Sequence, residues 1–372
     1  MASTWSETMS SCIIVANMLP PHFGWGTRAP GLRAEQLATQ ARPHFDEVRF
    51  LLFLERYGLM RTERGFAILT PQRADTTVIH QGDFKTFAER IEPATFVFTQ
   101  ADFTPLARQA ATRHAVVYDI LAPRWLELGE AGADERTLER YRNQHRAMLQ
   151  LARRTLVNGP KTERLLVSDL AGVDWVPSHL APTPLEVPAA ERTHLLFGGK
   201  AQRWTDVTLS FNAMAAFAQR QPSVGIFMVS ERVDERAPHA AAFGTLAMLP
   251  NVATLWNLSS RNYHELMARS FGFVDWAPLN EERIYATSTR VLQAIAAGVP
   301  VLHQAGTGLD EFFDAFPGER IGGTIQPEDV ARFVEKARAG AYREAVAAAR
   351  DRLAAYRSDT APFAGLGLAP CA

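Results

Sequence analysis

Short apolar runs alternate with segments of helical period along the first half of the chain. The apolar runs that predict β-strands lie at 12–18, 48–54, 77–80, 95–99, 115–118 and 155–157. The main helical patterns between them lie at 31–41, 104–112 and 135–153. Strands that alternate with helices are typical of parallel sheets covered by helices. The first half is therefore predicted to form one Rossmann-like α/β domain.

The second half repeats this rhythm after a proline-rich segment at 180–188 that reads as a linker. Strands are predicted at 194–197, 224–229, 253–255, 272–275 and 299–303. Helices are predicted at 205–220, 263–270, 289–297, 327–339 and 341–356. We therefore expect an α/β fold with two Rossmann-like domains in tandem, over residues 1–180 and 190–340. Residues 341–372 are expected to form a helix and tail that return to the first domain.

Length and composition agree with a globular protein of two domains. The 372 residues are too many for one compact core, and 47% hydrophobic with 21% charged residues is ordinary for a folded chain. The formal net charge of -1 indicates no nucleic-acid partner. Cys12 and Cys371 form neither a metal-ligand spacing nor a disulfide framework. With no signal-peptide pattern and no apolar run of spanning length, the chain is expected to be cytoplasmic.

Two segments of the first domain end strands at the edge where such folds bind ligands. After the first strand, Gly24 and Gly26 permit close backbone approach, and Arg28 and Arg33 follow at a helix start. They are candidates for donor and acceptor contacts, with a solvated loop as the alternative. Asp119 ends a buried strand and is a candidate for proton transfer or hydroxyl binding. Its alternative role is to cap the following helix.

Two segments of the second domain have the chemistry of a diphosphate site. Gly198 and Gly199 form a tight turn, and Lys200 and Arg203 supply positive charge before a helix. Farther along, Arg290 and Gln293 lie one turn apart near the start of a helix that turns sharply into the strand at 299–303. That face would meet the ribose and phosphates of a nucleotide. An exposed basic loop and an ordinary amphipathic helix are the respective alternatives.

Taken in order, these motifs resemble a branch of the retaining glycosyltransferases with two Rossmann domains, known as GT-B. The matching segments are 30–33 (Pro-Gly-Leu-Arg), 116–123 (Val-Val-Tyr-Asp-Ile-Leu-Ala-Pro), 198–206 (a Gly-Gly turn with Trp and Asp) and 289–292 (Thr-Arg-Val-Leu). The resemblance, of the family-4 type, covers most of residues 12–300. It implies a bacterial-type enzyme that moves a sugar from a nucleotide diphosphate sugar to a glycan, a lipid-linked glycan or a small molecule. It also implies retention of anomeric configuration and no need for a metal or other cofactor.

The same resemblance places the donor on the second domain. The base would lie near Trp256 and Asn257, and the ribose at Gln293. The diphosphate would contact Lys200, Arg203 and Arg290, together with the loop of Gly306, Thr307 and Gly308. The acceptor would enter from the first domain, past residues 24–33 and Asp119.

The chain departs from the family at a carboxylate pair. Gln293 replaces the glutamate that binds the donor ribose, and Tyr285 stands at the position of the earlier glutamate. Glu281 and Glu282 lie just upstream, and Glu282 is the candidate for the missing catalytic carboxylate. A non-catalytic nucleotide-sugar-binding partner of another transferase therefore stays open as an alternative, as does a nucleotide-sugar epimerase of the same fold.

A peripheral contact with a membrane, at its inner face, also stays open. Six arginines gather on or near the helix at 135–153, namely Arg136, Arg140, Arg142, Arg146, Arg153 and Arg154. The alternative is a solvated helix face on which Glu135 and Glu139 pair with some of these arginines.

Overall fold

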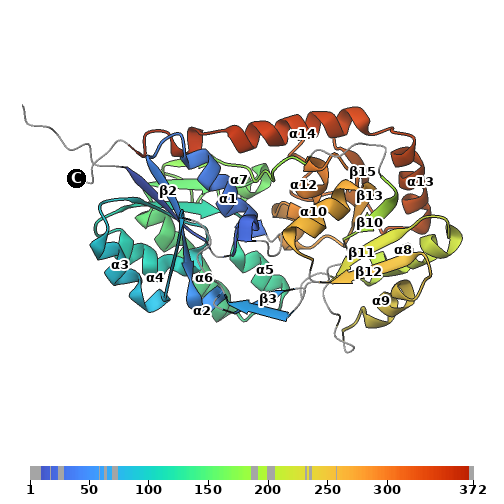
Figure 1. Cartoon of the computed structure of the whole chain (residues 1–372), viewed down its shortest axis with the longest axis horizontal. Coiled ribbons are helices and arrows are strands. Elements are labelled where there is room, and N and C mark those ends of the chain that lie inside the picture. The colour runs from blue at the N-terminus through green and yellow to red at the C-terminus, as the bar shows by residue number, and fades with distance from the viewer. Residues whose placement is uncertain are drawn as a thin grey trace, which may run out of the picture.

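Two separate parallel sheets, each with helices on both faces, lie side by side (Figure 1). The computed structural model describes residues 10–16, 18–23, 29–57, 59–62, 65–68, 74–185, 192–198, 206–230, 233, 237–256 and 258–367. The predicted fold class, two Rossmann-like α/β units in tandem, is confirmed.

The first sheet has seven parallel strands. In spatial order they are β5 (Thr76–Ile79), β2 (Glu47–Phe53), β1 (Ser11–Val15), β6 (Thr95–Phe98), β7 (Ala115–Ile120), β8 (Arg154–Val157) and β9 (Trp175–Pro177). The central strands β1, β6, β7 and β8 are almost wholly buried because both faces of the sheet are covered. Along β1, Ile13 and Val15 join one apolar cluster, and Cys12 and Ile14 join the other.

Helices cover both faces of this sheet. The first cluster is closed by α3 (Phe84–Arg90), α4 (Thr104–Ala110) and α6 (Glu135–Leu151), and the second by α1 (Ala29–Ala41) and a short turn at Ala361–Phe363. Three further helices are α2 (Leu54–Tyr57), α5 (Arg124–Glu130) and α7 (Pro160–Leu165). A two-stranded antiparallel hairpin joins β3 (Leu59–Thr62) to β4 (Gly65–Ile68).

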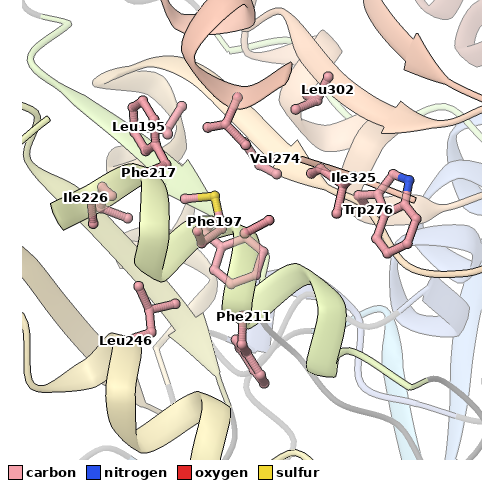
Figure 2. Close-up of a cluster of buried hydrophobic side chains, with 14 of the residues drawn as sticks. Leu195, Phe197, Phe211, Phe217, Ile226, Leu246, Val274, Trp276, Leu302 and Ile325 are labelled. Carbon is pink, nitrogen blue, oxygen red and sulfur yellow. The ribbon is translucent and has the colours of Figure 1, made fainter. Parts of the chain in front are cut away.

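The second sheet has six parallel strands. In spatial order they are β12 (Val252–Trp256), β11 (Ile226–Ser230), β10 (His194–Phe197), β13 (Ser270–Asp275), β14 (Val301–Gln304) and β15 (Gly318–Ile321). One face packs on α8 (Thr208–Arg220), α9 (Ala240–Ala247) and α13 (Pro327–Arg338), with Phe211 and Phe217 reaching from α8 towards the strands (Figure 2). Complete burial of each of these rings contributes about 2–3 kcal/mol.

The other face of the second sheet carries α10 (Ser260–Ala268), α12 (Thr289–Ala296) and α14 (Arg343–Ser358). Its apolar cluster also includes Leu32 of α1 and Leu180, so the two units share part of one core. A shared apolar core opposes free rotation of one unit against the other.

A row of buried polar side chains on α1 holds the chain where it passes between the units. The Gln36 amide donates to the His179 carbonyl at 2.8 Å and accepts from the Ala181 N–H at 2.9 Å. The Gln40 amide donates at 2.9 Å to the carbonyl of Tyr356, near the end of α14. These amides satisfy backbone groups that would otherwise be buried without partners.

Most predicted strands and long helices form within one to three residues of their expected ends. The structure adds β9, β15 and the hairpin, together with the shorter helices α3, α5, α7, α9 and α11 (Glu281–Tyr285). Strand β15 reads Gly-Glu-Arg-Ile, which lacks the apolar run expected of a buried strand. In the described part of the chain, no helix is long and apolar enough to cross a membrane.

Candidate functional site

A buried aspartate at the end of β13 is the centre of a charged cluster on the second unit. All six residues of β13 are buried, and Asp275 is the last of them, with 3% of its surface exposed. One carboxylate oxygen lies 2.9 Å from the Arg290 guanidinium, and the other accepts from the Ser288 hydroxyl at 3.0 Å. Burial alone would raise the pKa of Asp275, but Arg290 and Arg283, with the hydrogen bond from Ser288, hold that pKa below its usual value.

His303 on β14 supports this aspartate as a neutral imidazole. Its Nδ1 lies 2.7 Å from the Asp275 carbonyl, which can only accept, so Nδ1 carries the proton. Its Nε2 then accepts from the Thr307 hydroxyl at 3.2 Å. Burial, with the nearby Arg283, lowers the pKa of His303 to about 4. The imidazole is therefore uncharged at neutral pH.

The start of α12 brings Arg290 to the end of β10. Its guanidinium donates to the Gly198 carbonyl at 3.1 Å, and 26% of its side chain stays exposed. A Cβ on Gly198 would lie 2.8 Å from the Phe273 ring and 3.3 Å from an Asp275 oxygen, so this close approach requires glycine. Gly198 and Arg290, both predicted as donor contacts, are thus brought together.

Helix α11 carries the remaining charges and contacts the first unit. The Asn280 side chain caps it by accepting from the Arg283 N–H at 2.8 Å. The Glu281 N–H donates to the Glu130 carboxylate on α5 at 2.6 Å, and the Thr162 hydroxyl on α7 donates to the Tyr285 carbonyl at 3.1 Å. The cluster around Asp275 therefore lies where the two units meet.

Glu282 and Arg283 differ from the satisfied groups around them. Burial raises the pKa of Glu282 even though Arg283 and Arg290 oppose this. The Nε and Nη2 of Arg283 are buried and have no hydrogen-bond partner in the described part of the chain. A carboxyl that holds its proton more tightly than usual thus lies beside two guanidinium groups. Such a group suits proton transfer or hydroxyl binding, and guanidinium groups suit a diphosphate.

Gln293 and Trp256 lie at other parts of the predicted donor site. Gln293 is 2% exposed, its Nε2 lies 3.4 Å from the Nε2 of His264, and its Oε1 is buried without a partner among the described residues. Trp256 ends β12 with 40% of its surface exposed, beside the Phe243 ring at 5.6 Å.

The loop after β14, where diphosphate contacts are predicted at Thr307 and Gly308, is held by hydrogen bonds inside the protein. Thr307 is buried, and its hydroxyl is engaged by His303 and by the Leu309 N–H. The Gly308 N–H donates to the Arg283 carbonyl at 3.2 Å, and the Gly306 N–H donates to the Asp310 carboxylate at 2.6 Å. The Gly306 and Gly308 N–H groups therefore have partners inside the protein, and the loop braces α11, while the diphosphate contacts at Thr307 and Gly308 stay a prediction.

Asp119 and Arg33 form a buried ion pair with each other. Both side chains are 0% exposed, with an Arg33 Nη2 to Asp119 Oδ1 distance of 2.7 Å, and Nε contacts both carboxylate oxygens at 3.0 and 3.1 Å. In this arrangement neither reaches a substrate. We assign the pair to fixing α1 against β7, in place of the catalytic role predicted for Asp119 and the acceptor contact predicted for Arg33.

The other predicted site residues lie outside the described part of the chain. They are Gly24, Gly26, Arg28, Gly199, Lys200, Arg203 and Asn257. Conversely, the sequence interpretation gave no role to Asp275, Ser288, Arg283 or His303. The signal that pointed to Asp119, an acid that ends a buried strand, is equally present at Asp275. Among the described residues, no group of three or more His, Cys, Asp or Glu could hold a metal ion.

Comparison with solved structures identifies the fold. The sucrose-phosphate synthase of Thermosynechococcus elongatus superposes with a TM-score of 0.61 over 97% of this chain and 98% of that chain, at 14% identity. Anabaena HepE in complex with UDP-glucose gives a TM-score of 0.63 over 96% of both chains, at 11% identity. The fold is GT-B.

WaaG, a glycosyltransferase involved in lipopolysaccharide biosynthesis, also shares this fold. It gives a TM-score of 0.57 over 95% of this chain and 97% of that chain, at 15% identity. No protein-family model matches the sequence. No curated protein matches it either. The GT-B arrangement of both units is thus seen in the structure, where it spans nearly the whole chain.

Proposed function

We propose that this protein is a glycosyltransferase that moves a sugar from a nucleotide diphosphate sugar to a glycan, lipid-linked or small-molecule acceptor. The observation that carries the proposal is the cluster of Arg290, Arg283 and Glu282 at the carboxyl edge of the second sheet, facing the first unit. The nearly full-length similarity to GT-B proteins supports it. Transfer with retention and without a metal belongs to the proposal, because guanidinium groups can neutralise a leaving diphosphate without a metal ion.

Among the described residues, Arg283 and Arg290 are the side chains that would donate hydrogen bonds to the diphosphate. Arg283 has two buried nitrogens, Nε and Nη2, without partners among the described residues, and Arg290 is held by Asp275 with its side chain partly exposed. A preoriented cation stabilises developing charge without further reorganisation. Glu282, with its raised pKa, is assigned to contact the transferred sugar or to move a proton. The unpartnered Oε1 of Gln293 is assigned to accept from a ribose hydroxyl.

The deciding experiment is nucleotide binding by thermal shift against a panel of nucleoside diphosphates and nucleotide sugars. Uridine compounds come first because the HepE structure contains UDP-glucose. Loss of a charged hydrogen bond costs about 1.5–3 kcal/mol, so Arg290→Ala should weaken binding by about ten- to a hundredfold. The matched control is Arg220→Ala, an exposed arginine of the same unit that pairs with Glu328.

Arg290→Ala also leaves Asp275 without its nearest cation, so Arg290→Lys is measured beside it. The lysine keeps the charge but loses the planar donor geometry, and it should bind nucleotide more weakly than the native protein. Absence of binding by every nucleotide would refute the transferase proposal and the binding-partner alternative together.

The second candidate function, a non-catalytic nucleotide-sugar-binding partner, is favoured by the neutral amide of Gln293 at the ribose position. Donor hydrolysis or sugar transfer by the purified protein alone would exclude it. Glu282→Gln separates the two functions, because it should retain nucleotide affinity and lose turnover if Glu282 acts on the reacting sugar.

A further inference from the structure

An arginine-lined groove lies on the first unit between α4 and α6, the two helices seen on the left of Figure 1. Its volume is about 590 Å³, which is within the range of small-molecule sites. Arg108 comes from α4, and Arg136 and Arg140 come from α6. None of the residues that line it belongs to the cluster around Asp275, so the groove is a separate feature of the molecule.

The positive charge of this groove is not balanced by the described chain. Arg136 and Arg140 are four residues apart on one helix face, where like charges repel each other. No carboxylate of the described residues forms an ion pair with either of them or with Arg108. Asp134 acts on Arg140 only from beyond ion-pair distance.

Two neighbouring arginines of α6, Arg142 and Arg146, form ion pairs with carboxylates. Within this helix, the lack of a paired carboxylate among the described residues therefore distinguishes the arginines that line the groove. Arg142 lies 2.6 Å from Glu135 and 3.6 Å from Glu139. Arg146 lies 3.3 Å from Glu139, so the one acid in the groove wall is already engaged. The charges of Arg142 and Arg146 are thus paired with carboxylates, whereas those of Arg136 and Arg140, which line the groove, are not paired within the described part of the chain.

Gln144 of α6 also lines the groove. The Oε1 of Gln144 is buried and has no hydrogen-bond partner in the described part of the chain. Pro105 and Ala147 supply small apolar surfaces beside it. A ligand that satisfies this groove therefore carries negative charge for the three guanidinium groups, and a hydroxyl on it would reach the Gln144 Oε1 if that side chain turned towards the groove.

We propose that this groove binds a phosphate ester of a hydroxylated compound. Arginine guanidinium groups match the geometry of phosphate oxygens, and a neighbouring hydroxyl would donate to Gln144 once its amide turns into the groove. Such a group occurs in soluble phosphorylated compounds and in the headgroup of a glycerol-based anionic lipid. The inference goes beyond glycosyl transfer, since it requires nothing of the donor site.

The test uses the full chain with two probes. Glycerol 3-phosphate is titrated by calorimetry, and co-sedimentation is measured with phosphatidylcholine vesicles with and without phosphatidylglycerol. Arg136→Gln/Arg140→Gln should weaken binding about tenfold, as expected for two exposed charge-assisted contacts. Arg108→Gln, on the facing helix, should weaken it about threefold.

The matched control is Arg90→Gln/Arg113→Gln, which removes the same charge from the end of α3 and from the turn after α4, outside the groove. It should bind as the native protein does. Equal losses in both double variants, no loss in either, or no binding of either probe by the native protein would overturn the proposal. Binding of the soluble ester assigns a free phosphorylated ligand, and binding only to anionic vesicles assigns a lipid headgroup. Nucleotide thermal shifts on the same variants test the donor site separately.

Discussion

Removing the carboxylate of Asp119 is the sharpest test of how the first unit is held together. In Asp119→Ala, the Arg33 guanidinium stays fully buried and loses all three of its contacts with the carboxylate, at 2.7, 3.0 and 3.1 Å. What remains to it is the Gln36 amide oxygen at 3.3 Å. Removing one partner of a buried pair costs about 3–5 kcal/mol, because the surviving charge has no compensation.

The expected result is a large fall in the first thermal transition. For a unit of this size, about 1 kcal/mol shifts the midpoint by about 2–4 °C, so Asp119→Ala should lower it by about 6–20 °C. The midpoint is followed by far-UV circular dichroism. The double variant Arg33→Met/Asp119→Leu removes both charges and keeps apolar volume, so it should recover most of the loss.

The double variant also separates a structural role from a catalytic one. If Asp119→Ala melts like the native protein but loses sugar transfer, the buried-pair interpretation is refuted and the catalytic prediction for Asp119 returns. If the single and double variants are destabilised equally, the cost does not come from the unpaired charge. Recovery of stability by the double variant alone supports the structural assignment.

Two further changes test packing and protonation elsewhere. Gly308→Ala places a Cβ 2.5 Å from the Ala286 carbonyl oxygen and 2.8 Å from that of Tyr285, which are backbone atoms that cannot rotate away. It should cost about 1–3 kcal/mol in urea unfolding, whereas Gly225→Ala, with open space at its Cβ, should cost much less. Equal costs would show that the loop after β14 does not brace α11. His145 is buried against the Tyr118 hydroxyl at 3.0 Å, and burial lowers its pKa from 6.5 to about 4. Because the unfolded state then binds the proton more tightly, its contribution to stability is complete above about pH 6.5 and is lost as the pH falls towards 4. Between about pH 7 and pH 5 the loss should be about 1–2 kcal/mol, and His145→Gln should remove that part of the pH dependence. An unchanged pH dependence in the variant would contradict the buried neutral imidazole.

The order of elements could be predicted from local pattern alone. The stretches at 12–16 and 195–197 are apolar without interruption, as strands covered on both faces require, and the alternation of such runs with helical periods indicated two parallel sheets. The same reasoning missed β9 and β15, because a three-residue strand and a polar edge strand carry no apolar run. A long apolar run predicts a strand from local sequence alone. A short or polar edge strand forms only because a neighbouring strand offers hydrogen-bonding partners, and local sequence does not show that neighbour.

Only part of the candidate site could be predicted from the sequence, for the same reason. The spacing of Arg290 and Gln293 indicated a ligand-facing helix start, and the structure brings Arg290 to Gly198. The sequence could not show that the Gly308 N–H would donate to α11 or that the Thr307 hydroxyl would bond to His303. Those partners come from other elements, so no local spacing records them.

Asp119 and Asp275 show most clearly what the sequence determined and what it left to the tertiary structure. Asp119 is the last but one residue of its strand and Asp275 the last, and the sequence alone placed each near the carboxyl edge of its sheet. Asp119 meets Arg33, 86 residues away in the chain, and is sealed from solvent. Asp275 meets Arg290 and Arg283 beside the first unit, with one guanidinium partly exposed. Position follows from the periodicity of the chain, but burial and the choice of counter-ion follow from packing between distant segments, and these decide whether a carboxylate is structural or lies at a site.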